Sequence, residues 1–267
     1  MASEDRSQGL DVVTAGPGPT GKHRALKGAG HADLFTRFVA DYAALHPDRA
    51  IALLQAGCTT AGPELDLAVL RASGVDLLVS GVDDDCRSAR AAAARRPELS
   101  SATLGELRLV PLTPRSIDIV QCSMLLHRIA NAELVLGRLV GTLRPGGLLL
   151  LRTADRQTVA GLLDRKLPSF LRAITWRAAN AGQPGPFPAR YDPITSAHGI
   201  EAFVTRHGLV IAHRGTVRAP GRGSITGGIP LSHRLIAWLS GGRFTCSHDE
   251  LRYVIRKPEH PFARVLQ

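Results

Sequence analysis

Cysteine is scarce in this chain of 267 residues, and its spacing excludes a disulfide or metal framework. The four cysteines are Cys58, Cys86, Cys122 and Cys246. The three histidines that fall closest together are His198, His207 and His213. No two cysteines stand at the separation of a paired motif, and the histidines match no common ligand pattern. We therefore expect reduced thiols and no bound metal.

Long hydrophobic runs are also missing. The longest strongly apolar stretch is the leucine run over residues 148–151, far shorter than the roughly 20 residues that span a membrane. The first ten residues, MASEDRSQGL, carry acids where a signal peptide needs cations, and no apolar core follows them. These absences predict a soluble, cytoplasmic protein with no membrane partner.

Lysine is rare as well, so arginine supplies nearly all of the positive charge. The formal net charge is +10, a value that is typical of many nucleic-acid-binding proteins. The arginines are spread along the whole chain, however, and no basic run is interleaved with aromatic residues. We therefore expect no nucleic-acid partner.

The chain does contain a regular alternation of short apolar runs and helical patterns between Ile51 and Arg152. Four segments carry it: IALLQAGCTTAGPEL, LLVSGVDDDC, SIDIVQCSMLLHRI and LVGTLRPGGLLLLR. Strands that alternate with helices form parallel sheets buried on both faces, and such sheets bind ligands at the carboxyl ends of their strands. The pattern predicts an α/β fold with a nucleoside-type ligand at that edge.

These segments resemble the class I S-adenosylmethionine-dependent methyltransferases, in particular their small-molecule branch, which is methyltransferase type 11-like. The resemblance implies a Rossmann-like, doubly wound sheet of seven strands in the order 3-2-1-4-5-7-6, with strand 7 antiparallel. It also implies S-adenosyl-L-methionine as the cofactor. We expect a disordered tail over 1–31, a methyltransferase domain over 32–258 with an acceptor-binding insert at about 155–199, and a short tail over 259–267.

The first two cofactor motifs follow the first two expected strands. In the family, three spaced glycines pass close to the methionine part of the cofactor. Here Gly57 keeps its place, Thr59 and Ala61 replace the other two glycines, and Gln55 replaces an acid. The resemblance assigns the ribose hydroxyls to Asp83, with Asp84 next to it. The glycine motif is therefore degenerate, and it predicts weaker cofactor binding than in relatives with three glycines.

The third and fourth motifs carry the remaining cofactor residues. The resemblance places Glu106 and Leu107 beside the adenine, and Cys122, after the fourth expected strand, beside the transferred methyl group. His127 matches a histidine common in the small-molecule branch and is the candidate general base, because its ordinary pKa lies near neutrality. Each position also has a purely structural interpretation: a turn, a helix start, a loop glutamate or a buried histidine.

The acceptor is expected to lie under the aromatic residues of the insert, Trp176, Phe187 and Tyr191. The Asn-Pro-Pro-aromatic signature of amino and nucleobase methylation is absent, since QCSM follows the fourth strand. We therefore expect O- or C-methylation of a small apolar or aromatic metabolite by a monomer or homodimer. Two alternatives stay open: a binding or scaffold subunit that has lost methyl transfer, and a non-methylating cyclase.

Overall fold

The structure, a computed structural model, covers most of the expected methyltransferase domain. It describes residues 34–59, 65–85, 87–179, 187–218 and 231–259, without the side chains of 87–88, 175–179 and 231–232. These ranges belong to one unit that begins at Ala32. The expected tail over 1–31 and all but the first residue of the tail over 259–267 lie outside them. Within the described ranges, no helix is long and apolar enough to cross a membrane.

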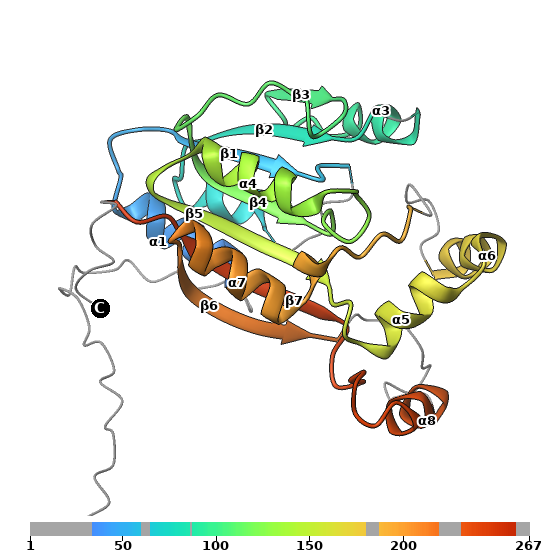
Figure 1. Cartoon of the computed structure of the whole chain (residues 1–267). Coiled ribbons are helices and arrows are strands. Elements are labelled where there is room, and N and C mark those ends of the chain that lie inside the picture. Colours follow the sequence, from blue (N-terminus) through green and yellow to red (C-terminus); the bar gives the residue numbers. More distant parts are fainter. Residues whose placement is uncertain (1–33, 60–64, 86, 180–186, 219–230, 260–267) are drawn as a thin grey trace, which may run out of the picture. The chain divides into compact units, whose positions relative to one another are not determined.

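Seven strands form one sheet in the order β3-β2-β1-β4-β5-β7-β6, which confirms the expected topology (Figure 1). They are β1 (Ile51–Ala56), β2 (Leu77–Asp83), β3 (Ser101–Leu104), β4 (Ile117–Ser123), β5 (Leu143–Ala154), β6 (Val210–Val217) and β7 (Glu250–Arg256). β1 to β5 pair in parallel, and β7 runs antiparallel between β5 and β6. The ends of β1, β2 and β4 therefore meet along one side of the sheet, which we call the carboxyl edge.

Helices cover both faces of this sheet. They are α1 (Leu34–Ala44), α2 (Leu67–Ala72), α3 (Arg87–Ala93), α4 (Ala132–Thr142), α5 (Val159–Lys166), α6 (Ser169–Ala179), α7 (Ala197–His207), α8 (Leu231–Leu239) and the short 3-10 helix η1 (Pro193–Thr195). α1 and α2 pack into a hydrophobic core on one face, and α4 and α7 into a second core on the other. In Figure 1, α5, α6 and α8 lie on the side toward which the parallel strands point.

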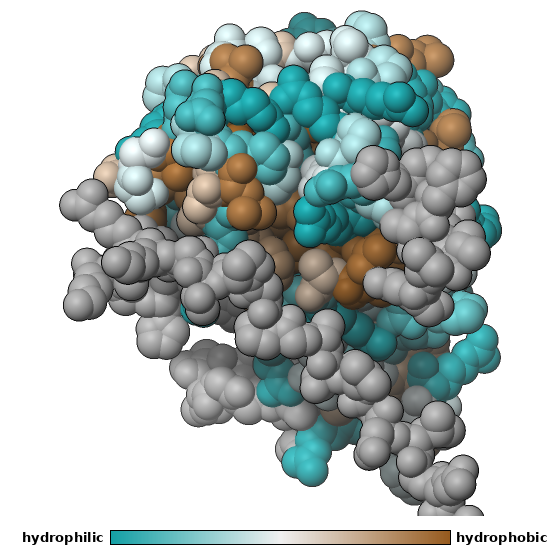
Figure 2. Space-filling model, turned by 90° about the vertical axis from the view of Figure 1, so that its left-hand side faces the viewer, coloured by the Kyte–Doolittle hydropathy of each residue, from teal (hydrophilic) through white to brown (hydrophobic). Residues whose placement is uncertain are grey.

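The surface of the domain mixes polar and apolar residues. Figure 2 shows hydrophilic residues over most of the upper part of one face, with hydrophobic residues gathered toward its middle. Such a mixture is ordinary, because more than half of a protein's accessible surface comes from apolar atoms. The features that position the candidate site lie at the ends of the strands.

Helix ends follow local signals with one exception. Gly208 closes α7 in the left-handed conformation, with a φ of 58°, as its residue type predicts. Asn131, the residue before α4, is of a type that commonly caps helices, but it adopts a φ of 52° and makes no side-chain capping bond. Asp192, just before η1, accepts the hydrogen bond from the Ala132 N–H at 2.9 Å instead. The cap of α4 therefore comes from the insert.

Asp118 ties the amino-terminal ends of the central strands together, opposite the carboxyl edge. Its fully buried carboxylate accepts hydrogen bonds from Arg49, Arg144, the Tyr42 hydroxyl and the Ala52 backbone N–H, at 2.7 to 3.2 Å. Burial alone would raise the pKa of this carboxyl, but the two guanidinium groups and the backbone N–H outweigh it and lower the pKa to about 2. Asp118 is a structural residue of the sheet.

We predict that Asp118→Asn lowers the free energy of unfolding by about 2–3 kcal/mol at pH 7, because two arginines lose their anion. In the folded protein the pKa of Asp118 is about 2, below its ordinary value of about 4. Its stabilisation is therefore complete above pH 4 and disappears as the pH falls toward 2. Urea unfolding at pH 7, 5 and 3 measures this. An unchanged pH dependence in the variant would contradict the assignment.

Candidate functional site

The turn after β1 lies close against the end of β4 and needs glycine at one position. Gly57 has a φ of 80°, and its N–H donates to the Val82 carbonyl at 2.9 Å. A Cβ atom at this position would approach the Ser123 carbonyl oxygen to 2.8 Å. Both the backbone conformation and the contact exclude a larger residue. The glycine that the sequence retains is thus required by the turn itself.

Asp83, at the end of β2, lies beside this turn and is already saturated with donors. Its Oδ2 accepts hydrogen bonds from the Thr59 backbone N–H at 3.0 Å and from the Thr59 hydroxyl. Its Oδ1 accepts from the Asp84 N–H at 2.9 Å and from Arg128 Nη2 at 2.5 Å. The residue is 1% exposed. A carboxylate offers about four acceptor positions, so all of those on Asp83 are in use.

Arg128 reaches Asp83 from the segment between β4 and α4. Both side chains of this ion pair are 2% exposed, which makes it a buried pair. The guanidinium carbon also lies 4.2 Å from the centre of the Phe187 ring, a cation–π contact with the insert. Arg128 was not among the residues that the sequence motifs singled out. It connects the predicted ribose acid to the predicted acceptor region.

Gln55, which replaces the acid of the first motif, belongs to a neutral amide network. Its Nε2 donates to Gln121 Oε1 at 2.9 Å, and its Oε1 accepts from Arg96 Nη2 at 2.8 Å. Arg96 also donates to the Cys58 carbonyl. The Gln121 Nε2 is buried and has no hydrogen-bond partner among the described residues. The network joins β1, β4 and the end of α3 under the turn.

Cys58 and Cys122 are buried and unreactive. Burial raises the pKa of each thiol to about 12, with the negative charge of Asp83 adding to the effect. Both are therefore protonated thiols at neutral pH, and the thiolate is the nucleophilic form. Cys122 lies inside the core that packs against α4 and α7. Neither cysteine can serve as a nucleophile.

The remaining predicted cofactor residues differ in exposure. Asp84 is exposed next to Asp83. The half-exposed carboxylate of Glu106 pairs with Arg108 two residues later. Leu107 is buried in the core, 4% exposed, and its carbonyl accepts a hydrogen bond from Arg138 Nη1 at 2.7 Å. Of these three, Asp84 and Glu106 present polar groups to solvent.

The insert is fastened to His127. The backbone N–H groups of Arg190 and Tyr191 both donate to the His127 carbonyl, at 2.9 and 3.0 Å. The His127 and Tyr191 rings lie 5.4 Å apart, and the buried Tyr191 donates its hydroxyl to Asp164 at 2.9 Å. The structure therefore brings His127 together with Tyr191 and, through Arg128, with Phe187. Trp176 falls within α6, but its side chain lies outside the described residues.

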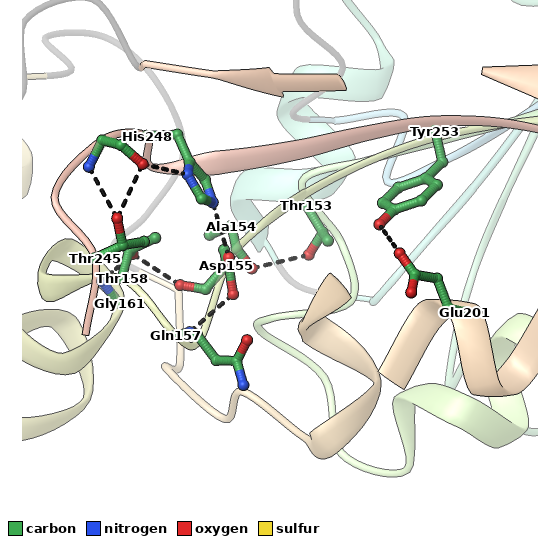
Figure 3. A network of polar contacts seen from close by, with 11 residues as sticks. Thr153, Ala154, Asp155, Gln157, Thr158, Gly161, Glu201, Thr245, His248 and Tyr253 are labelled. Atoms are coloured by element: carbon green, nitrogen blue, oxygen red, sulfur yellow. Dashed lines mark hydrogen bonds and ion pairs between the residues drawn. The ribbon is translucent and has the colours of Figure 1, made fainter. Parts of the chain in front are cut away.

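A second histidine stands at the end of β5 (Figure 3). His248 Nε2 lies 2.9 Å from the buried Asp155 carboxylate, and its Nδ1 lies 3.0 Å from the Ser247 hydroxyl. The Thr245 backbone bonds to the chain around α5, with its N–H donating to the Gln157 carbonyl at 3.0 Å. No spacing signal in the sequence marked this pair, because its members lie 93 residues apart. Asp155 fixes the orientation of the ring.

The strand order is that of a class I S-adenosylmethionine-dependent methyltransferase fold. Residues 54–151 match the family model described as a methyltransferase domain, and this range runs from within β1 to within β5. This match and the topology identify a class I S-adenosylmethionine-dependent methyltransferase domain in this chain. No curated protein matches the chain in sequence.

Three solved structures illustrate the fold. The [4+2]-cyclase SpnF has a TM-score of 0.51 at 16% identity, covering 85% of this chain and 80% of that one. A Mesorhizobium loti S-adenosylmethionine-dependent methyltransferase has a TM-score of 0.47 at 16% identity, and the match covers 81% of this chain and 97% of that one. Haemonchus contortus phosphoethanolamine N-methyltransferase 2, in complex with S-adenosyl-L-methionine, has a TM-score of 0.47 at 16% identity. The match covers 83% of this chain and 52% of that one. At these identities the likeness concerns the fold alone.

The residues at the carboxyl edge fit S-adenosylmethionine in kind, with one condition. A nucleoside needs two acceptor positions on Asp83 for its ribose hydroxyls. Arg128 and Thr59 use those positions in this structure. A fit would therefore require both the Thr59 hydroxyl and Arg128 to give up the positions on Asp83 that they occupy here.

We predict strong energetic coupling between Arg128 and Asp83. Arg128→Met and Asp83→Asn each leave the charged partner buried without its counter-charge. Each should therefore lower the free energy of unfolding by about 3–5 kcal/mol. The double variant should lose less than the sum, because it leaves no buried charge unpaired. Urea unfolding of all four proteins measures the coupling.

The exposed pair Arg90–Asp85, with side chains 69% and 36% exposed, is the matched control for this cycle. Arg90→Met should cost less than about 1 kcal/mol. Strictly additive losses for the buried pair would contradict the interaction that the geometry shows.

Proposed function

We propose that this chain transfers the methyl group of S-adenosyl-L-methionine to an oxygen or carbon atom of a small apolar or aromatic molecule. One observation carries this proposal: the end of β2 with Asp83, the segment after β4 with His127, and the insert around Phe187 and Tyr191 converge at the carboxyl edge. The methyltransferase family match over residues 54–151 supports it.

The residues proposed to hold the cofactor line this edge. Gln55, Gly57 and Thr59 would flank its methionine part, Asp83 and Asp84 its ribose, Glu106 and Leu107 its adenine, and Cys122 its methyl group. When bound, the cofactor supplies a methyl group already activated on a sulfonium centre. The protein therefore needs mainly to orient the acceptor and to accept a proton from it.

Two histidines are candidates for that proton acceptor. His127 lies against Tyr191 within the proposed acceptor region, where Phe187 and Trp176 would supply further apolar contact. His248 is held by the Asp155 carboxylate at the end of β5. A carboxylate that holds one ring nitrogen orients an imidazole for proton transfer at the other, but in His248 the other nitrogen is hydrogen-bonded to the Ser247 hydroxyl. The location of His127 favours it when the acceptor lies under the insert.

A second candidate function is a binding or scaffold protein, or a cyclase, that uses the fold without methyl transfer. The saturation of Asp83 by four donors from this chain favours it, because a structure so arranged is stable without a nucleoside. The fold also occurs in SpnF, a [4+2]-cyclase. A binding or scaffold protein differs from the methyltransferase in whether S-adenosylhomocysteine, the product of methyl transfer, binds. A cyclase assisted by the cofactor differs in that no methyl group is transferred.

Calorimetric titration with S-adenosylhomocysteine tests the proposal, and Thr59 offers a matched pair of variants. Thr59→Ala removes the hydroxyl that donates to Asp83 and so releases one acceptor position. We predict that it tightens binding about three- to tenfold, the effect of one hydrogen bond. Thr59→Ser keeps a hydroxyl at the same position and should bind like the parent protein.

Methyl transfer is then measured with radiolabelled S-adenosylmethionine and a panel of phenols and other apolar acceptors. If the parent chain and all Thr59 variants give neither heat nor a thermal shift at millimolar S-adenosylhomocysteine, with the acceptor panel absent and with it present, methyl transfer is excluded. The binding or scaffold function then stands in its place.

A further inference from the structure

Two contacts of Arg128 are with residues from two different parts of the proposed site. Its Nη2 donates to Asp83 Oδ1 at 2.5 Å, and the centre of the Phe187 ring lies 4.2 Å from its guanidinium carbon. Asp83 is the proposed ribose acid, and Phe187 belongs to the proposed acceptor region. A single side chain thus touches both halves of a two-substrate site.

The backbone next to Arg128 carries the same connection. The His127 carbonyl accepts hydrogen bonds from the N–H groups of Arg190 and Tyr191. A shift of residues 187–191 therefore pulls on residues 127 and 128 directly. Movement of the insert and movement of Arg128 are mechanically linked through two backbone hydrogen bonds and one ring contact.

Electrostatics restricts where the guanidinium can go. Arginine stays charged in proteins, so in its position at 2% exposure the guanidinium needs an anion or an aromatic face, and without them it has to turn toward solvent. Asp83 and the Phe187 ring supply both here. If Phe187 is drawn onto another apolar body, the guanidinium loses part of its stabilisation at Asp83 and its population in that position falls.

We propose that Arg128 makes cofactor binding depend on the acceptor. Without a bound acceptor, Arg128 keeps its cation–π contact with Phe187 and its hydrogen bond to Asp83, which closes Asp83 to the ribose. An apolar acceptor that packs on Phe187 and Tyr191 releases Arg128, and the position that Arg128 leaves on Asp83 Oδ1 then accepts a ribose hydroxyl. This inference rests on the proposed function, and linkage makes the effect reciprocal: cofactor also strengthens acceptor binding.

The test compares S-adenosylhomocysteine binding in variants that loosen Arg128 by different routes. Phe187→Ala removes the ring contact and leaves the buried ion pair intact, so the variant should fold. Apparent affinity scales with the population of the open state, and loss of one cation–π contact should tighten binding about three- to tenfold. Arg128→Met removes the closing group itself and should tighten binding further where the variant folds.

Arg165→Met is the matched control. Arg165 lies 5.6 Å from the Tyr191 ring, makes the same type of contact with the insert and has no hydrogen bond to Asp83. Its S-adenosylhomocysteine affinity should equal that of the parent protein. Thermal unfolding without ligand verifies that each variant is folded before titration.

The outcomes separate this inference from the proposed function. Tighter binding by Phe187→Ala, including binding where the parent protein shows none, supports the role of Arg128. Equal or weaker binding by Phe187→Ala, in a parent protein that does bind, overturns the coupling and leaves methyl transfer in place. Absence of binding in parent, Phe187→Ala and Arg128→Met overturns both, because the site then stays closed without its closing residue.

Discussion

A carboxylate that is removed from water must have its acceptor positions filled, and the carboxyl edge of this sheet is organised around that requirement at Asp83. The turn after β1 supplies two donors through Thr59, and Asp84 supplies its backbone N–H. The segment after β4 supplies the fourth donor, Arg128. In this fold family the same position is expected to serve a ribose. Here donors from the chain itself occupy the carboxylate of Asp83. The loop after β1 and Arg128 contact Asp83 directly, and the insert contacts Arg128 through Phe187.

Much of the fold could be predicted from the sequence because it depends on local patterns. The apolar runs that become β1, β4 and β5 are mostly buried on both faces, whereas Leu78 of β2 is exposed. Alternating runs with helices between them permit few sheet orders. Gly57 was also predictable, since a retained glycine after a strand marks a turn with positive φ. The cap of α4 was not, because its acceptor, Asp192, lies 60 residues away in the chain.

The sequence predicted that Asp83 ends a strand, but not which groups fill the acceptor positions of its carboxylate. Asp83 could be placed because it ends a strand, but its partner Arg128 lies 45 residues later, in a run whose apolar residues pack into the core. A guanidinium in that run carries no spacing signal that distinguishes it from the many surface arginines. The replacement of an acid by Gln55 suggested only a loss, whereas the structure shows an amide network with Gln121 and Arg96. Long-range polar pairing is the information that patterns of hydrophobicity omit.

The position of β7 has a consequence for how the chain is made. β5 and β6 have no contact as neighbouring strands; each pairs with β7, which is the last strand in the sequence. Until residue 256 has left the ribosome, one side of β5 and both sides of β6 have no strand to pair with. Unpaired strand edges are the surfaces on which chains aggregate. The domain therefore passes through synthesis with a gap inside its sheet, and α7 and β6 must wait for the closing strand.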